Sequence, residues 1–185
     1  MTSLGLLLLR LAFGGLLMGH GAQKLFGAFD GHGPEGTGQF LESMGMRPGR
    51  FWAQVAGWSE FGGGMLTALG LLHPAGPMLT IAPMVMATTK AHAGKPIWVT
   101  AGGAELPVTN IAIASALTLT GPGIFSLDAL LGTRLGFRGV TLMATGLAFG
   151  LLHANDVRPQ KALQVVQERT AEVRQQAEKV LSPVA

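Results

Sequence analysis

The ionisable side chains of this chain are few, and several of them interrupt long apolar runs. Arg10 lies inside the run of residues 4–27, whose far end also carries His20, Gln23 and Lys24. Glu60 is the only charged residue between positions 51 and 72. A charge is costly in hydrocarbon, so a membrane helix that keeps one normally turns it into a helix bundle and often uses it. These residue types therefore predict a polar site inside a membrane protein.

A second polar group lies around the glycine-rich segment 94–104. If the apolar runs cross a bilayer alternately, the ends that flank this segment share one side with the end of the first run. This side would collect His20, Gln23, Lys24, Lys90, His92, Lys95 and Glu105, with Glu60 deeper in the bundle. Arg10 would lie toward the other side, with Asp128 and the Gly-Pro-Gly turn at residues 121–123. The first-choice ion pair is Arg10 with Glu60, and the second is His20 with Glu60 or Glu105.

The chemistry of these residues fits a polar pocket beneath a membrane surface. Such a pocket would suit a lipid headgroup, a quinone carbonyl or a proton path. His20 and His92 are the donors expected to face a quinone. No His or acidic pair has the spacing of a known metal motif, so no metal is expected. The methionines at 78, 84 and 86 are read as core filling. A buried pair that only fixes helix orientation remains the alternative.

Composition favours a membrane protein. Of 185 residues, 12% are charged, which is about half the average of soluble proteins, and 28 are glycine. The net charge is +3, but five of the thirteen Lys and Arg residues lie after Asn155 and are interleaved with four acidic residues, so no nucleic-acid partner is expected. There is no cysteine, which excludes a thiol relay or a disulfide within this chain. Residues 1–26 lack the basic start of a signal peptide and are predicted to stay as a helix.

Hydrophobic periodicity predicts an all-α protein. Helices are expected at residues 3–26, 51–72, 78–91 and 105–120, with a surface amphipathic turn at 37–44 and a short capped segment at 129–131. Pro83 is expected to bend the third long helix. Glu60 shares a face with small residues, where another helix can approach closely. The lipid bilayer is thus the first expected partner.

The chain after residue 132 divides into two parts. Residues 133–155 form a fifth hydrophobic segment, read either as a fifth crossing or as an interfacial or re-entrant helix. Residues 156–185 are predicted to be a soluble helical tail with apolar residues at alternating steps of three and four, suited to a partner or to a second copy in a homo-oligomer. Cytoplasmic loops carry an excess of Lys and Arg, so counting these residues on each side predicts the orientation. With five crossings the count places the tail in the cytoplasm, and with four crossings it barely favours either orientation.

In its ordered set of motifs, the chain resembles the DoxX family of bacterial membrane proteins. The resemblance is carried over residues 4–132 by Arg10, HGAQKLFG at 20–27, GTG at 36–38, FLESMG at 40–45, EFGGG at 60–64, GLL at 70–72, KAH at 90–92, GGAE at 102–105 and GPGIFSLD at 121–128. It implies a transmembrane four-helix bundle at residues 1–132, in the multi-pass form of a bacterial inner-membrane protein.

The resemblance also implies a role in redox chemistry. The family takes its name from a thiosulfate:quinone oxidoreductase, and members take part in redox and detoxification complexes with soluble partners. The chain is therefore expected to be a membrane subunit or anchor of a redox complex, with quinone as the candidate cofactor; its own catalytic activity stays open. The alternatives are a non-catalytic scaffold that recruits partners through its C-terminal helix, and a small-solute or proton carrier built on Glu60.

Overall fold

A computed structural model describes residues 2–133 and 135–156 of the chain, and the regular structure of these residues is helical. The predicted soluble tail lies outside the described residues. The α-helices are α1 (Thr2–Phe26), α2 (Gly33–Ser43), α3 (Gly49–Leu69), α4 (Ala75–Met86), α5 (Glu105–Thr120), α6 (Leu127–Leu131) and α7 (Phe137–Asp156). A π-helical turn, η1 (Ala87–Ala91), extends α4, and a 3-10 turn, η2 (Val99–Ala101), precedes α5. The all-α prediction is confirmed.

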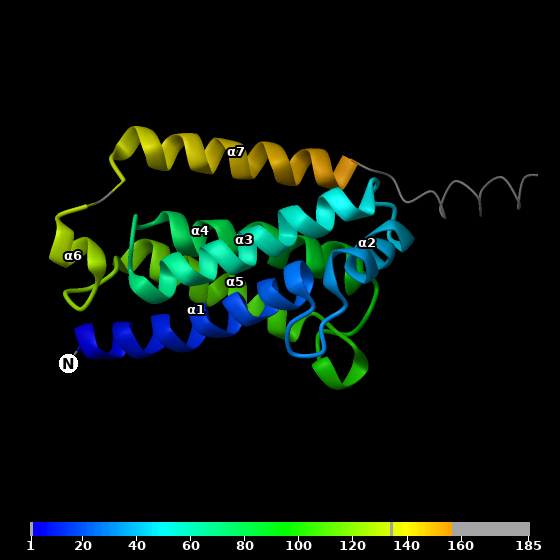
Figure 1. Cartoon of the computed structure of the whole chain (residues 1–185), viewed down its shortest axis with the longest axis horizontal. Coiled ribbons are helices and arrows are strands. Elements are labelled where there is room, and N and C mark those ends of the chain that lie inside the picture. The colour runs from blue at the N-terminus through cyan, green and yellow to red at the C-terminus, as the bar shows by residue number, and fades with distance from the viewer. Residues whose placement is uncertain (1, 134, 157–185) are drawn as a thin grey trace, which may run out of the picture.

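Helices α1, α3, α4 and α5 pack in a ring, each against its two neighbours (Figure 1). Phe13 and Leu17 of α1, Met84 of α4 and Ala114 and Leu117 of α5 form the buried core between them. The π-helical turn and α2 lie at one end of this bundle, and α6 lies at the other (Figure 1). Helix α7 packs on α4, on the side of the bundle opposite α1 (Figure 1).

The most extensive helix pair, α1 with α3, depends on glycine. A Cβ on Gly14 would lie 2.5 Å from the carbonyl oxygen of Gly64, and a Cβ on Gly64 would lie 2.5 Å from that of Gly14. Seven residues further along α1, a Cβ on Gly21 would lie 2.7 Å from the carbonyl oxygen of Gly57. Only glycine permits this close backbone approach. The two contacts fix the antiparallel register, because residue numbers on α1 rise as those on α3 fall.

Helix ends follow local sequence signals. Helix α3 stops at Leu69, three residues earlier than predicted, because Gly70 adopts the left-handed conformation with φ of 63° and Leu71 N–H donates back to Leu66. The surface turn expected at 37–44 is the longer helix α2, which Pro34 helps to begin. Helix α4 continues through Pro83, and departure from α geometry comes later, at the π-helical turn.

Asp128 stabilises the end of the bundle that carries α6 by hydrogen bonds to the turn between α3 and α4. Its carboxylate accepts hydrogen bonds from the backbone N–H groups of Leu72 and His73 and from the Thr133 hydroxyl, each at 2.8 Å. Burial opposes ionisation of Asp128, but these hydrogen bonds outweigh it and hold its pKa below the ordinary value of 3.8. Asp128 is therefore an anion at neutral pH, and it ties the α3–α4 turn to α6. Ser126 Oγ accepts from Ala129 N–H and caps α6, which begins at Leu127, two residues earlier than the predicted capped segment.

Among the described residues, α1 alone is long and apolar enough to cross a membrane by its length and composition. The hydrophobic segment predicted at 133–155 is helical as α7, which has 20 residues.

Candidate functional site

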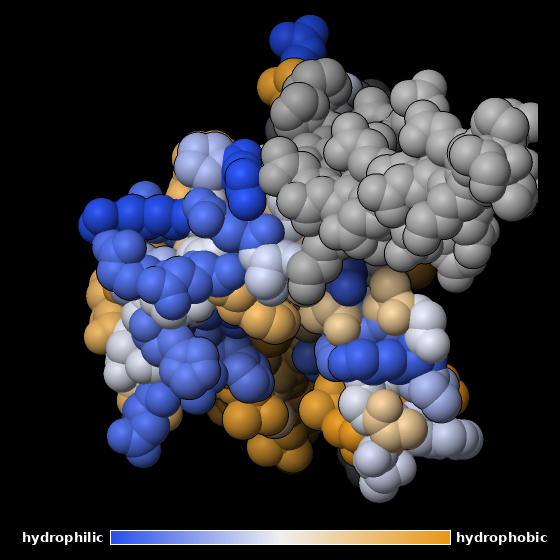
Figure 2. All heavy atoms as spheres, turned by 90° about the vertical axis from the view of Figure 1, so that its right-hand side faces the viewer, coloured by the Kyte–Doolittle hydropathy of each residue, from blue (hydrophilic) through white to orange (hydrophobic). Residues whose placement is uncertain are grey.

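The bundle contains a largely apolar cavity of about 350 Å³ near the end that carries α2. This volume is within the range of small-molecule sites in proteins. Helices α1, α2, α3, α4 and α5 all contribute to its wall, and Gly150 of α7 closes one part of it. The apolar lining includes Leu17, Phe40, Leu41, Met44, Met46, Trp52, Val55, Met84, Met86 and Leu106. Viewed from this end, the surface is hollowed between two lobes, with hydrophobic residues within the hollow (Figure 2).

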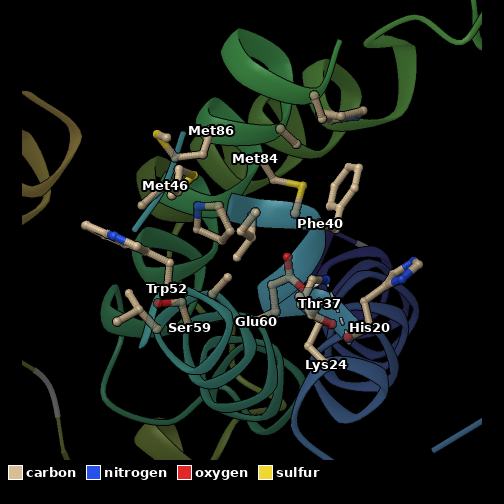
Figure 3. Close-up of a pocket in the computed structure, with 18 of the residues that line it drawn as sticks. His20, Lys24, Thr37, Phe40, Met46, Trp52, Ser59, Glu60, Met84 and Met86 are labelled. Carbon is tan, nitrogen blue, oxygen red and sulfur yellow. Dashed lines mark hydrogen bonds and ion pairs between the residues drawn. The ribbon is translucent and has the colours of Figure 1, made fainter. Parts of the chain in front are cut away.

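The polar wall of the cavity is an ion pair between α1 and α3. Lys24 Nζ donates to Glu60 Oε2, and both residues line the cavity. The Glu60 side chain is only 4% exposed, whereas that of Lys24 is 27% exposed. Figure 3 shows the Glu60 carboxylate pointing into the cavity, below Phe40 and Met84. A buried carboxylate requires such a partner, and the pair presents an overall neutral but strongly polar patch to a ligand.

His20 and Gln23 continue this polar wall toward the surface. His20 lines the cavity, and its Nδ1 is 3.1 Å from Gln23 Oε1. Lys24 Nζ lies 3.5 Å from the backbone carbonyl oxygen of His20. Four of the predicted polar residues of the site thus lie together on adjacent turns of α1 and on α3. His20 also acts electrostatically on Glu60, although no hydrogen bond joins them among the described contacts. The cavity is thereby connected to solvent through polar atoms.

The predicted pair of Arg10 with Glu60 is wrong. Arg10 is 2% exposed, and its Nη2 donates to the backbone carbonyl of Phe125 at the opposite end of the bundle, where Asp128 also acts on it electrostatically. Its Nε and Nη1 atoms have no hydrogen-bond partner among the described residues. In a helix each Cα–Cβ bond tilts toward the N-terminus. Arg10 therefore points away from Glu60, whereas Lys24 points toward it.

His92 and Glu105 belong to a separate structure at the same end. His92 Nδ1 is 2.6 Å from the carbonyl oxygen of Gly102, and Glu105 Oε2 accepts from the backbone N–H of Val99 at 2.9 Å. Neither residue lines the cavity, and neither does Lys90. Of the two histidines expected to face a quinone, the structure brings only His20 to the cavity.

The residues that sequence reasoning missed are small polar ones inside the cavity wall. Thr37 of α2, Ser59 of α3 and Asn110 of α5 all line it. Asn110 Nδ2 lies 3.5 Å from Met84 Sδ, a weak partner that leaves the amide able to bind a stronger acceptor. The available signals were position and type: Ser59 adjoins Glu60, and Asn110 is the only amide side chain in α5.

Comparison with known proteins identifies one family. The family model for DoxX matches residues 5–93, a segment that contains all but the first three residues of α1, together with α2, α3, α4 and η1. It thus holds Lys24 and Glu60 and most of the cavity wall, while α5, α6 and α7 follow the matched segment. No curated protein and no solved structure matches the chain. Over its residues 5–93, the chain is therefore similar to the DoxX family.

Proposed function

We propose that the chain is a multi-pass protein of the bacterial inner membrane. The match of residues 5–93 to the DoxX family model and the apolar helix α1 support this proposal. So does the outer surface of the ring of helices. Leu8 and Leu16 of α1, Trp58 of α3 and Leu119 of α5 are each more than half exposed. Large exposed apolar side chains on several helices are the surface expected of a protein that a bilayer covers.

We infer that the cavity binds a lipid-soluble molecule with an uncharged polar head, of the quinone class. The observation that carries this inference is the Lys24–Glu60 pair in the wall of an otherwise apolar cavity. Because the two charges cancel, a neutral head fits better than an ion: a quinone carbonyl could accept from Lys24, and the hydroxyl of its quinol form could donate to Glu60. Asn110 and Ser59 give further polar contacts on other parts of the wall. An apolar tail would lie against the methionines and Phe40.

The role that follows is a membrane subunit or anchor of a redox complex. The chain has no cysteine, so thiol chemistry would belong to a soluble partner that supplies the electrons. In this proposal the bundle holds the quinone, and His20 and the Lys24–Glu60 pair connect its head to the solvent side for proton exchange. A carboxylate and a histidine are the usual groups for such exchange.

The test is purification of the intact protein from its native membrane in mild detergent. Quinone should be recovered in the lipid extract, and a partner that reduces it, with thiosulfate as the first donor to try, should co-purify. His20→Ala or Glu60→Gln should abolish quinol formation while the partner stays bound. Recovery of the partner with normal turnover in both variants would contradict the quinone role and support a scaffold instead.

A further inference from the structure

The segment between η1 and α5 presents three consecutive large apolar side chains to the outside. Ile97 is 47% exposed, Trp98 62% and Val99 48%. The cavity does not use them, because none of the three lines it. Side chains of this size on the tip of a loop require something to cover them.

The loop is built to hold these side chains outward. The Trp98 carbonyl accepts hydrogen bonds from Ala101 N–H at 3.0 Å and from Gly103 N–H at 2.9 Å, and the Ile97 carbonyl accepts from Glu105 N–H at 2.8 Å. The Glu105 carboxylate accepts from Val99 N–H, and His92 contacts the Gly102 carbonyl. His92 and Glu105, which were predicted to line the pocket, thus stabilise this loop through their contacts with its backbone.

The position of the loop indicates what covers it. It projects sideways from the bundle, near the end that carries α2, and not along the helix axes (Figure 1). The helix that follows the loop, α5, also exposes an apolar side chain: Val108 is 42% exposed and does not line the cavity. Lys95, on the same loop, is exposed. Tryptophan with a neighbouring lysine is the composition found where a protein meets the headgroup region of a bilayer.

We propose that Ile97, Trp98 and Val99 form an interfacial anchor, inserted among lipid headgroups and the first part of the acyl chains. This rests on the proposed membrane insertion of the bundle. The anchor would hold the cavity end of the protein at a fixed depth in the bilayer, with Lys95 directed at lipid phosphates. Continuity with the apolar face of α5 favours lipid over a protein partner.

The test uses the full chain in vesicles, with Trp98 as its only tryptophan after Trp52→Phe and Trp58→Phe. Its emission should be quenched by lipids brominated near the glycerol end of the acyl chain more than by lipids brominated near the bilayer centre. Aqueous acrylamide should quench it weakly. Strong acrylamide quenching with no effect of either brominated lipid would overturn the proposal and leave a protein partner as the occupant.

A second position separates this inference from membrane insertion itself. Leu16 of α1 is 71% exposed, and Leu16→Trp in a chain with no other tryptophan should be quenched by the lipid brominated near the centre. If Leu16→Trp is quenched and Trp98 is not, the anchor is wrong and the bundle remains inserted. If neither is quenched, both proposals fail. Glu105→Ala should reduce brominated-lipid quenching of Trp98, whereas Glu105→Gln, which keeps an acceptor for Val99 N–H, should preserve it.

Discussion

Reversing the charge of Lys24 or Glu60 alone is expected to prevent stable folding, and reversing both is expected to restore it. Each single reversal leaves two like charges in contact, one of them 4% exposed, in place of an ion pair. Breaking a buried pair in this way typically costs about 3–5 kcal/mol of folding free energy. Yield of folded protein and thermal unfolding in detergent would measure the effect for Lys24→Glu, Glu60→Lys and the double variant.

The chain offers a matched control in Glu35 and Arg50. This pair is 3.0 Å apart, but both side chains are 66% exposed. Reversing either residue should cost less than about 1 kcal/mol, because water screens exposed pairs. Glu60→Arg should not rescue Arg10→Glu, since the Arg10 side chain points away from Glu60 and donates to the Phe125 carbonyl. Rescue in that combination, or no rescue in the Lys24–Glu60 combination, would show that the pairing is wrong.

Alanine at neighbouring glycines is expected to change stability in opposite directions. Gly14→Ala and Gly64→Ala place a methyl group 2.5 Å from a backbone oxygen of the facing helix, so α1 and α3 must separate, at a cost of about 1–3 kcal/mol or more. Gly15→Ala and Gly62→Ala meet nothing within 4 Å. They should stabilise the helices by about 0.5–1 kcal/mol, because alanine loses less backbone entropy.

Thermal unfolding of the four alanine variants in the same detergent provides the measurement. The comparison is sharp because Gly14 and Gly15 are adjacent in sequence and differ only in the face on which they lie. Equal effects at both positions would mean that α1 and α3 do not approach through Gly14 and Gly64, and the register drawn from these contacts would be lost.

Much of the fold could be read from the sequence because strong local signals mark the helix ends. The predicted helix at 105–120 matches α5, which starts at Glu105 and stops where Gly121 follows. The predicted first helix differs from α1 by one residue. The errors lie at 69–72, where one left-handed glycine ends α3, at 75–77, where α4 begins three residues earlier than predicted, and at 33–43, where weak hydrophobicity conceals a full helix.

The site could be predicted in its residues but not in its pairing. The glycine contacts set residue 18 of α1 opposite Glu60, about 9 Å of helix rise from Lys24 and about 12 Å from Arg10. The difference in helix rise alone does not decide whether Lys24 or Arg10 pairs with Glu60. Side-chain direction does, because Lys24 and Glu60 tilt toward each other and Arg10 tilts away. This comparison requires the register of α1 against α3, which depends on which glycines of the two helices face each other. The sequence alone does not reveal which glycines these are.

The most direct test of the central claim is a quinone titration read by Trp52, which lines the cavity. Trp58 is the control: it lies six residues away on α3, is 55% exposed and packs on Phe26 outside the cavity. Two variants, each keeping one of these tryptophans, would be titrated in lipid nanodiscs with a short-chain quinone. Binding in the cavity predicts saturable quenching of Trp52 that Glu60→Gln weakens, with no saturable quenching of Trp58. Equal, non-saturating quenching of both tryptophans would contradict it.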